Sequence, residues 1–150
     1  MPESSFREVV RVVGVDLSGF NLLSYELTKI KGIGPTLAKI IPRITGIPEN
    51  LRVGLLTDDQ VRKIESTIKN LHSHVPNYLV NRNKDRETGL SLHLIGSDLK
   101  FQVDRDISFE KKIGTWRGLR HKLGLKVRGQ RTRTTGRKGR VVGVRRRKTR

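Results

Sequence analysis

The acidic residues of this 150-residue chain stop at Glu110, whereas the basic residues continue to its end. Residues 1–110 hold 15 Lys and Arg and all 14 Asp and Glu, so their net charge is +1, whereas residues 111–150 hold 17 Lys and Arg and no acid. A segment with this charge and few large apolar residues cannot bury enough surface to offset the entropy it would lose on folding. The sequence therefore predicts a near-neutral folded body and a basic segment that becomes ordered only against a polyanion.

The acid-free segment, defined here as residues 111–150, has a composition suited to nucleic acid. Arginine outnumbers lysine in it, and Gly and Thr are interspersed with the bases between Arg117 and Thr134. Small residues let a backbone pass close to phosphates, and guanidinium groups bind phosphate oxygens in pairs. Composition does not separate RNA from DNA. An acidic membrane surface and a role as a solubility tail are weaker alternatives, the latter because seventeen uncompensated cations repel one another.

The rest of the composition narrows the class of protein. The chain has no Cys, only 34% hydrophobic residues and only 5% aromatic residues. It therefore lacks disulfides, thiolate zinc sites and cysteine nucleophiles, and a neutral metabolic enzyme is disfavoured. No apolar run reaches the roughly 18 residues that cross a bilayer, and the first residues lack the features of a signal peptide. We expect an unexported protein with no membrane partner.

Periodicity and turn residues predict a mainly α-helical fold. A short strand is expected over residues 8–15, helices over residues 21–30, 35–45, 57–71, 98–113 and 115–123, and a possible minor β-hairpin over residues 78–94. We divide the chain into a mostly helical globular body, residues 1–114, and a second part, residues 115–150. The second part is a short helix followed by a long extended Arg/Gly/Thr-rich basic C-terminal tail.

Particular residues fix the expected ends of these helices. Asn21, Asp98 and Thr115 are candidate N-caps. Thr57 and Gln60 have the spacing of a capping box, which predicts the start of the clearest helix.

The second and the last of these helices have features that bear on how they pack. Pro42 falls inside the second helix, where it removes the hydrogen bond to the Ala38 carbonyl and is expected to kink or shorten the helix. The apolar face of this helix is expected to comprise Leu37, Ala38, Ile41 and Ile44. Trp116, Leu119 and Leu123 share one face of the last helix, and we expect them to pack inward and anchor the tail to the body.

The segment between the first two helices matches a helix-hairpin-helix turn. It comprises Lys31, Gly32, Ile33 and Gly34. Two glycines allow a tight turn and a close approach to an anion, Ile33 can hold the turn to the core, and free amides at the start of the next helix face outward. Contact with a phosphate or another subunit, and a purely structural turn, are both consistent with this pattern.

Nothing in the chain predicts catalysis, a metal site or a cofactor. His72 and His74 lie two residues apart, which places them on different sides of a helix without a third ligand. Asp58 and Asp59 are explained as first-turn acids. Lys39 is the residue to consider for a base-excision lyase on a helix-hairpin-helix scaffold, and a helix-hairpin-helix DNA-binding protein is the main alternative function.

A longer pattern is far more specific than the turn. Arg117-Gly118-Leu119-Arg120-His121, Gly124-Leu125 and Val127-Arg128-Gly129-Gln130-Arg131-Thr132-Arg133-Thr134, with Gly32-Ile33-Gly34, resemble small-subunit ribosomal protein family thirteen, whose eukaryotic member is numbered eighteen. The resemblance covers nearly the whole chain. Residues 78–94 are more similar to the archaeal and eukaryotic branch than to the bacterial one.

This resemblance implies a non-catalytic cytoplasmic protein in the head of the small ribosomal subunit. It implies head rRNA, P-site tRNA, small-subunit ribosomal protein nineteen and, at an intersubunit bridge, large-subunit ribosomal protein five as partners. The implied rRNA contacts are Arg117, Arg120, His121, Lys122, Arg128, Arg131, Arg133, Arg137, Lys138 and Arg140. The residues implied to lie nearest the tRNA are Arg145, Arg146, Arg147 and Lys148.

Overall fold

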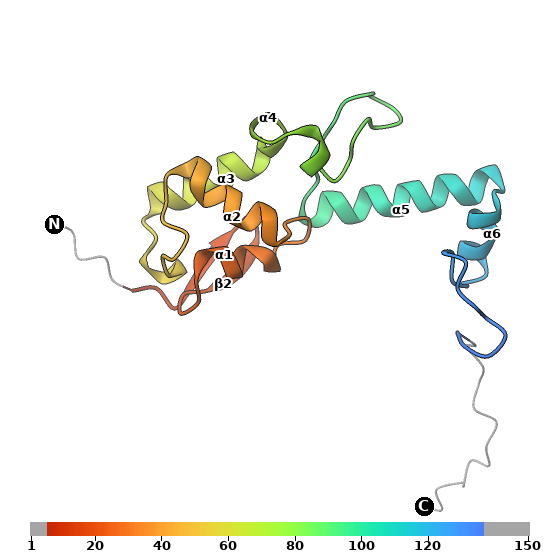
Figure 1. The fold of residues 1–150 in the computed structure, drawn as a ribbon, viewed down its shortest axis with the longest axis horizontal. Helices are drawn as coiled ribbons and strands as arrows, with labels where there is room; N and C mark the ends of the chain where they lie inside the picture. Colours follow the sequence, from red (N-terminus) through yellow and green to blue (C-terminus); the bar gives the residue numbers. More distant parts are fainter. Residues whose placement is uncertain (1–5, 137–150) are drawn as a thin grey trace, which may run out of the picture. The chain divides into compact units, whose positions relative to one another are not determined.

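The computed structural model describes residues 6–136, and over these the chain is mainly α-helical, as expected (Figure 1). The elements in chain order are β1 (Val9–Val12), β2 (Val15–Ser18), α1 (Leu23–Glu26), the 3₁₀ helix η1 (Leu27–Lys29), α2 (Pro35–Thr45), the 3₁₀ helix η2 (Val53–Leu55), α3 (Asp58–Lys69), α4 (Leu71–His74), the 3₁₀ helix η3 (Asn77–Leu79), α5 (Gly96–Ile113) and α6 (Trp116–Lys122).

These residues form two compact units, one ending at Phe101 and the other beginning at Gln102, so the division lies within α5. Every buried hydrophobic side chain of the described residues belongs to the first unit, between Val10 and Val80. The described part of the acid-free segment therefore adds nothing to the core, which agrees with its composition. The boundary expected between residues 114 and 115 stays a prediction.

The expected strand over residues 8–15 is wrong at its end, because the chain reverses there. β1 and β2 form an antiparallel hairpin whose paired residues are Val9 with Ser18, Val10 with Leu17, Arg11 with Asp16 and Val12 with Val15. Val13 and Gly14 make the turn with φ angles of 47° and 74°. Positive φ is costly for a β-branched residue, so the local pattern did not predict it. The turn is held from α3, because the Val13 amide donates to Glu65 Oε1 at 2.9 Å.

The first expected helix is split into α1 and η1, and Asn21 is not its N-cap. Leu22 occupies the N-cap position and makes no side-chain cap. The Asn21 amide instead donates to Glu26 Oε1 at 2.7 Å, while Glu26 Oε2 accepts from the Ser18 amide and pairs with Lys29 Nζ at 2.7 Å. Burial raises the pKa of Glu26, but these hydrogen bonds outweigh it and leave the pKa lowered. Asn21 thus serves a buried carboxylate rather than a helix end.

Helix α2 is not shortened by its proline. Pro42 is fully buried and the helix continues to Thr45. Gly46 then ends the helix at φ 73°, and the Ile47 amide donates to Pro42 O at 2.9 Å. Ile44, expected on the apolar face, is instead 38% exposed.

Helix α3 begins with the expected capping box. The Gln60 amide donates to Thr57 Oγ1, and the Thr57 amide donates to Gln60 Oε1. Ile64 and Ile68 are buried, and α2 packs against both α1 and α3. These contacts hold α2, the helix that follows residues 31–34, against the core.

The expected hairpin over residues 78–94 is a loop with one antiparallel bridge, between Arg82 and Leu92. Asp85 organises the loop by accepting hydrogen bonds from the Arg82 guanidinium and from Thr88. The Arg82 bond is the main reason that the pKa of Asp85 falls to about 2. A side-chain network therefore holds this loop in place of a strand ladder.

Helix α5 starts earlier than expected, so Asp98 is not its cap. The helix begins at Gly96, which places Asp98 in its first turn. The Leu99 amide donates to Ile95 O at 3.4 Å, and Gly114 ends the helix at φ 78°. Helix α6 follows after two residues, Gly114 and Thr115. Thr115 is the expected N-cap, and its Oγ1 accepts from the Gly118 amide.

Candidate nucleic-acid interface

The predicted hairpin lies between η1 and α2, and its four residues have different surroundings. Lys31 and Gly34 are exposed, whereas Ile33 is buried and its amide donates to Ile30 O at 3.0 Å. Gly32 has φ 104°, a conformation that side chains disfavour. The turn therefore presents Lys31 and Gly34 outward, while Ile33 holds it to the core.

The start of α2 carries the free backbone donors of this surface. Gly34 is the N-cap, and its carbonyl accepts from the Ala38 amide at 2.9 Å. Pro35 has no N–H, so Thr36 and Leu37 supply the first-turn amides without intrahelical acceptors. Such amides favour anionic groups.

The hairpin is braced from behind by the chain leading into α5. The Gly96 amide donates to Lys31 O at 2.8 Å. A Cβ on Gly32 would lie 2.6 Å from Leu94 O, so only glycine fits. Asn81 fixes Leu94 in turn, because its side chain donates to Leu94 O at 2.6 Å and accepts from the Leu94 amide at 2.9 Å.

His93 is the buried centre of this brace. Its Nδ1 accepts from the Asn81 amide at 3.3 Å, so the proton of the neutral ring lies on Nε2, which donates to Gly32 O at 3.1 Å. Burial lowers the pKa of His93, and the bond to the Gly32 carbonyl only partly opposes that shift. Sequence reasoning placed His93 in the expected β-hairpin and missed this contact, which spans 61 residues.

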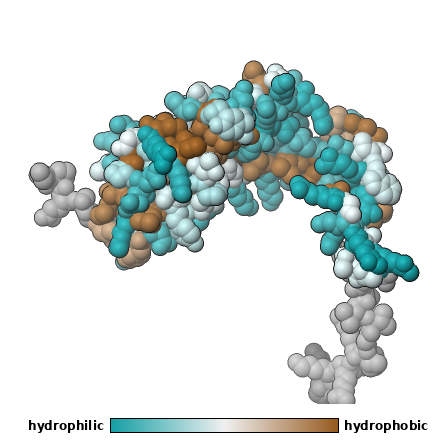
Figure 2. Space-filling view, viewed as in Figure 1, coloured by the Kyte–Doolittle hydropathy of each residue, from teal (hydrophilic) through white to brown (hydrophobic). Residues whose placement is uncertain are grey.

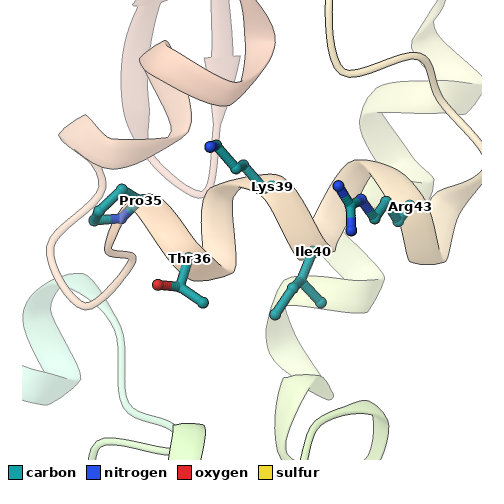
Figure 3. A pocket seen from close by; sticks show the side chains of 5 residues that line it. All are labelled: Pro35, Thr36, Lys39, Ile40 and Arg43. Carbon is teal, nitrogen blue, oxygen red and sulfur yellow. The ribbon is translucent and has the colours of Figure 1, made fainter.

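An open groove of about 450 Å³ follows α2 beyond the hairpin. It is lined by Pro35, Thr36, Lys39, Ile40 and Arg43, and in Figure 3 Lys39 and Arg43 lie on one side of the helix. Arg43 Nε donates to Glu49 Oε1 at 2.5 Å. Lys39 is exposed and makes no ion pair within residues 6–136. The groove is thus a basic extension of the hairpin surface.

The predicted rRNA-contacting side chains that the structure describes lie on α6 and the chain after it. Those classed as exposed are Arg117, Lys122, Arg128, Arg131 and Arg133, and those half-buried are Arg120 and His121. None of these side chains pairs with a carboxylate within residues 6–136. Their charges are therefore available to a partner.

The remaining predicted contacts lie outside the described residues. They are Arg137, Lys138, Arg140, Arg145, Arg146, Arg147 and Lys148.

Trp116 does not anchor the tail as expected. Its side chain is 71% exposed, and Leu119 and Leu123 are 43% and 64% exposed. The buried residue of α6 is Gly118, where a Cβ would lie 2.0 Å from Glu110 O. The residue of α6 that faces α5 is therefore a glycine and not one of the apolar side chains. Because glycine has no side chain, the backbone of α6 can lie directly against the end of α5. The surface over α5 and α6 accordingly mixes hydrophobic and hydrophilic patches (Figure 2).

Among residues 6–136, no group of three His, Cys, Asp or Glu side chains is placed to hold a metal ion. Within the same range, no helix combines the length and apolar character needed to cross a membrane.

Comparison with known proteins identifies the family. The model of the family "Ribosomal protein S13/S18" matches residues 11–138, which include the hairpin, α6 and the acid-free segment as far as Lys138. The chain belongs to the ribosomal protein S13/S18 family. The expectation drawn from the Arg-Gly-Leu-Arg-His and Arg-Gly-Gln-Arg-Thr motifs is thereby confirmed.

Archaeal relatives of the S13/S18 family match nearly end to end. A small ribosomal subunit protein uS13 of Aeropyrum pernix is 50% identical over 97% of this chain and 98% of its own length. That of Saccharolobus solfataricus is 53% identical over 95% of this chain and 87% of its own length. That of Methanopyrus kandleri is 45% identical over 96% and 97%, respectively.

Proposed function

We propose that this S13/S18 family protein is a cytoplasmic structural constituent of the small ribosomal subunit and binds head rRNA through its acid-free segment. The observation that carries the proposal is the separation of charge at Glu110. Beyond it lie seventeen bases and no acid, and the described ones from Arg117 to Arg133 have no carboxylate partner within residues 6–136. Such bases bind phosphates and release condensed counterions.

The sequence context makes rRNA a better partner for this segment than DNA. The relatives that match almost the whole chain carry the name of a small-subunit ribosomal protein. The acid-free segment also offers arginine, glycine and threonine in alternation, a composition that can follow a folded phosphate backbone closely. We expect this segment to become ordered when it threads between rRNA helices.

The finer part of the proposal assigns partners to separate surfaces. The hairpin, residues 31–34, and the basic groove along α2 would face the large subunit at an intersubunit bridge, against ribosomal protein five. The acid-free segment would run beside small-subunit protein nineteen, with residues 145–148 nearest the P-site tRNA. The exposed Lys31 and Gly34, the unpaired Lys39 and the resemblance to the family support this arrangement.

Sedimentation of the native protein tests the ribosomal assignment. In a sucrose gradient at ribosome-preserving salt, the protein should migrate with small subunits and intact ribosomes. When magnesium is lowered and the subunits separate, it should remain with the small subunit. Migration as free protein, or with DNA, would contradict the proposal and favour the helix-hairpin-helix DNA-binding alternative.

Salt dependence tests the acid-free segment directly. If six to ten bases contact phosphates, affinity for a head rRNA fragment should fall about 10³-fold to 10⁵-fold between 50 and 200 mM salt. Changing Arg117, Arg120 and Lys122 together to Gln should reduce the slope of log affinity against log salt by about two to three.

The matched control changes three exposed bases of α3, Arg62, Lys63 and Lys69, to Gln. Because both variants lose three charges, a difference between them reports the place of the charges and not their number. Equal reductions of the slope in both variants would contradict the assignment of the contacts to the acid-free segment.

A further inference from the structure

Trp116 is the only tryptophan of this chain, and aromatic residues make up only 5% of the sequence. A large aromatic side chain is usually used in the core, yet Trp116 is exposed. Trp116 is 71% exposed, and its indole N–H makes no hydrogen bond within the described residues. A tryptophan that contributes nothing to the core leaves a large apolar, aromatic surface in water. That surface is available to a partner.

Trp116 follows a turn between α5 and α6 that is held by a close backbone contact and by side-chain hydrogen bonds. Gly118 lies so close to Glu110 O that a Cβ there would be at 2.0 Å. Thr115 Oγ1 accepts from the Gly118 amide at 3.0 Å and donates to Glu110 Oε2 at 2.5 Å. Trp116, directly after this cap, is therefore held in place before any partner arrives.

A guanidinium covers part of the ring. Arg120 Cζ lies 5.7 Å from the centroid of the Trp116 ring, and Arg120 Nε donates to Lys126 O at 2.9 Å. The cation–π contact and this hydrogen bond orient both side chains. The rest of the ring stays open, as its exposed fraction requires.

The charges near Trp116 in the sequence favour nucleic acid over a protein partner. Lys111, Lys112, Arg117 and Lys122 are exposed, and no acid follows Glu110 in the sequence. Protein interfaces are depleted of lysine at their cores, whereas nucleic-acid sites combine aromatic rings with cations that hold the backbone. An aromatic ring stacks on a base only when that base has a free face, as in RNA loops, bulges and single strands.

We propose that Trp116 is a stacking platform for an unpaired RNA base, with Arg120 as the positioning residue that orients the ring. This rests on the proposed binding of rRNA and adds to it a contact that is not electrostatic. The basic residues that lie near Trp116 in the sequence would bind the phosphates beside the stacked nucleotide.

Because Trp116 is the only tryptophan, its fluorescence reports the contact in the full-length protein. Single-stranded oligouridylate should quench the fluorescence and protect the ring from acrylamide. A blunt RNA duplex of equal nucleotide count should bind through charge and leave the ring accessible to acrylamide. Trp116→Ala should weaken oligouridylate binding by about 5-fold to 150-fold, the range measured for the loss of one base–aromatic stack.

Two further variants separate stacking from general apolar contact. Trp116→Phe should lose less affinity than Trp116→Leu, because only Phe retains an aromatic face. Leu123→Ala removes another exposed apolar side chain of the same segment and should leave affinity unchanged. All of these variants should keep the salt slope of the parent protein, since no charge is changed.

The outcomes distinguish this proposal from the one on which it rests. RNA binding with a normal salt slope, but with unchanged fluorescence and less than two-fold loss in Trp116→Leu, would overturn stacking alone. Absence of RNA binding at any salt would overturn both proposals. Protection of the ring in assembled small subunits, but not in complexes with RNA alone, would assign it to a protein contact and overturn stacking.

Discussion

The two glycines of the hairpin, Gly32 and Gly34, have different surroundings. Gly32 is required by its φ of 104° and by the carbonyl of Leu94 behind it, whereas a Cβ on Gly34 would meet open space at an ordinary φ of −92°. The two glycines of one motif therefore have different roles. Gly32 serves the fold, and Gly34 leaves the outward backbone open to a partner.

Alanine substitutions should separate these roles. Gly32→Ala should lower the free energy of unfolding by at least about 2 kcal/mol, because it combines unfavourable φ with a backbone clash. Gly34→Ala should change it by less than about 0.5 kcal/mol, since the gain from restricting the unfolded chain offsets a poorer N-cap. Urea unfolding of both variants measures the difference. Equal losses would contradict the assigned roles.

His93 should make stability depend on pH. Because its pKa is lowered in the folded state from an ordinary value of 6.5, the unfolded chain binds the proton first. The unfolding free energy should therefore be at its full value above about pH 6.5 and decrease below it, by at most about 1.4 kcal/mol per pH unit. Lys69 and Asp98, which line the cavity beside the ring, bear opposite charges.

The measurement is the urea midpoint between pH 7.5 and 5.5. His93→Gln, which cannot titrate, should flatten the dependence, whereas His72→Gln at an exposed position should not. A parent protein whose midpoint is constant over this range would refute the prediction.

At the scale of elements, local signals predicted helix ends and failed where distant residues decide. The Thr57 capping box acts within one turn and is present as expected. Helices α2 and α5 end at residues 45 and 113 as expected, each followed by a glycine with positive φ. The turn at Val13 depends instead on Glu65, which lies 52 residues away. Asn21 binds Glu26, a near neighbour in the sequence whose carboxylate is buried by the tertiary fold. A sequence pattern contains no record of such partners.

The same distinction explains the candidate site. Its basic residues were identified from charge and motif, which are local properties, and Arg117 and Lys122 are exposed. Their contact with rRNA stays a prediction. The hydrogen bond between His93 and the Gly32 carbonyl was not predictable, because it joins residues 61 positions apart. The outward position of Trp116 was missed because the small inward residue of α6, Gly118, gives no hydrophobic signal. An aromatic residue among cations was the available clue.

Gly118 should control the attachment of α6 without affecting the body. In Gly118→Ala the new Cβ would overlap Glu110 O, so α6 should separate from the end of α5. Amide hydrogen exchange in α6 should accelerate and the fluorescence anisotropy of Trp116 should decrease. The thermal midpoint of the body should stay within about 2 °C, because Gly118 lies outside the hydrophobic core, whose buried residues run from Val10 to Val80. Unchanged exchange in α6 would show that the contact is dispensable.

For the whole molecule, stability and charge are carried by different residues. The buried hydrophobic side chains of the described residues lie between Val10 and Val80, while the acid-free segment begins at residue 111. Binding energy and folding energy are thus separable. Substitutions in the acid-free segment should alter affinity without altering the core, and core substitutions should do the reverse.

Truncation after Gly114 tests this separation. The shortened chain retains every residue of the described core, so its thermal midpoint at moderate salt should lie within a few degrees of that of the full chain. Calorimetry measures both midpoints. A loss of more than about 10 °C would show that the acid-free segment stabilises the body.

The brace between Gly32 and His93 also fixes an order of events during synthesis. A chain is synthesised from its N-terminus. The hydrogen bonds from His93 and Gly96 to the hairpin can therefore form only after residue 96 has been made. Residue 96 precedes the first residue of the acid-free segment. By the time the cations emerge, the surface that holds Lys31 and Gly34 is already formed. The acid-free segment, which attracts polyanions most strongly, is thus synthesised after all the residues that hold the hairpin.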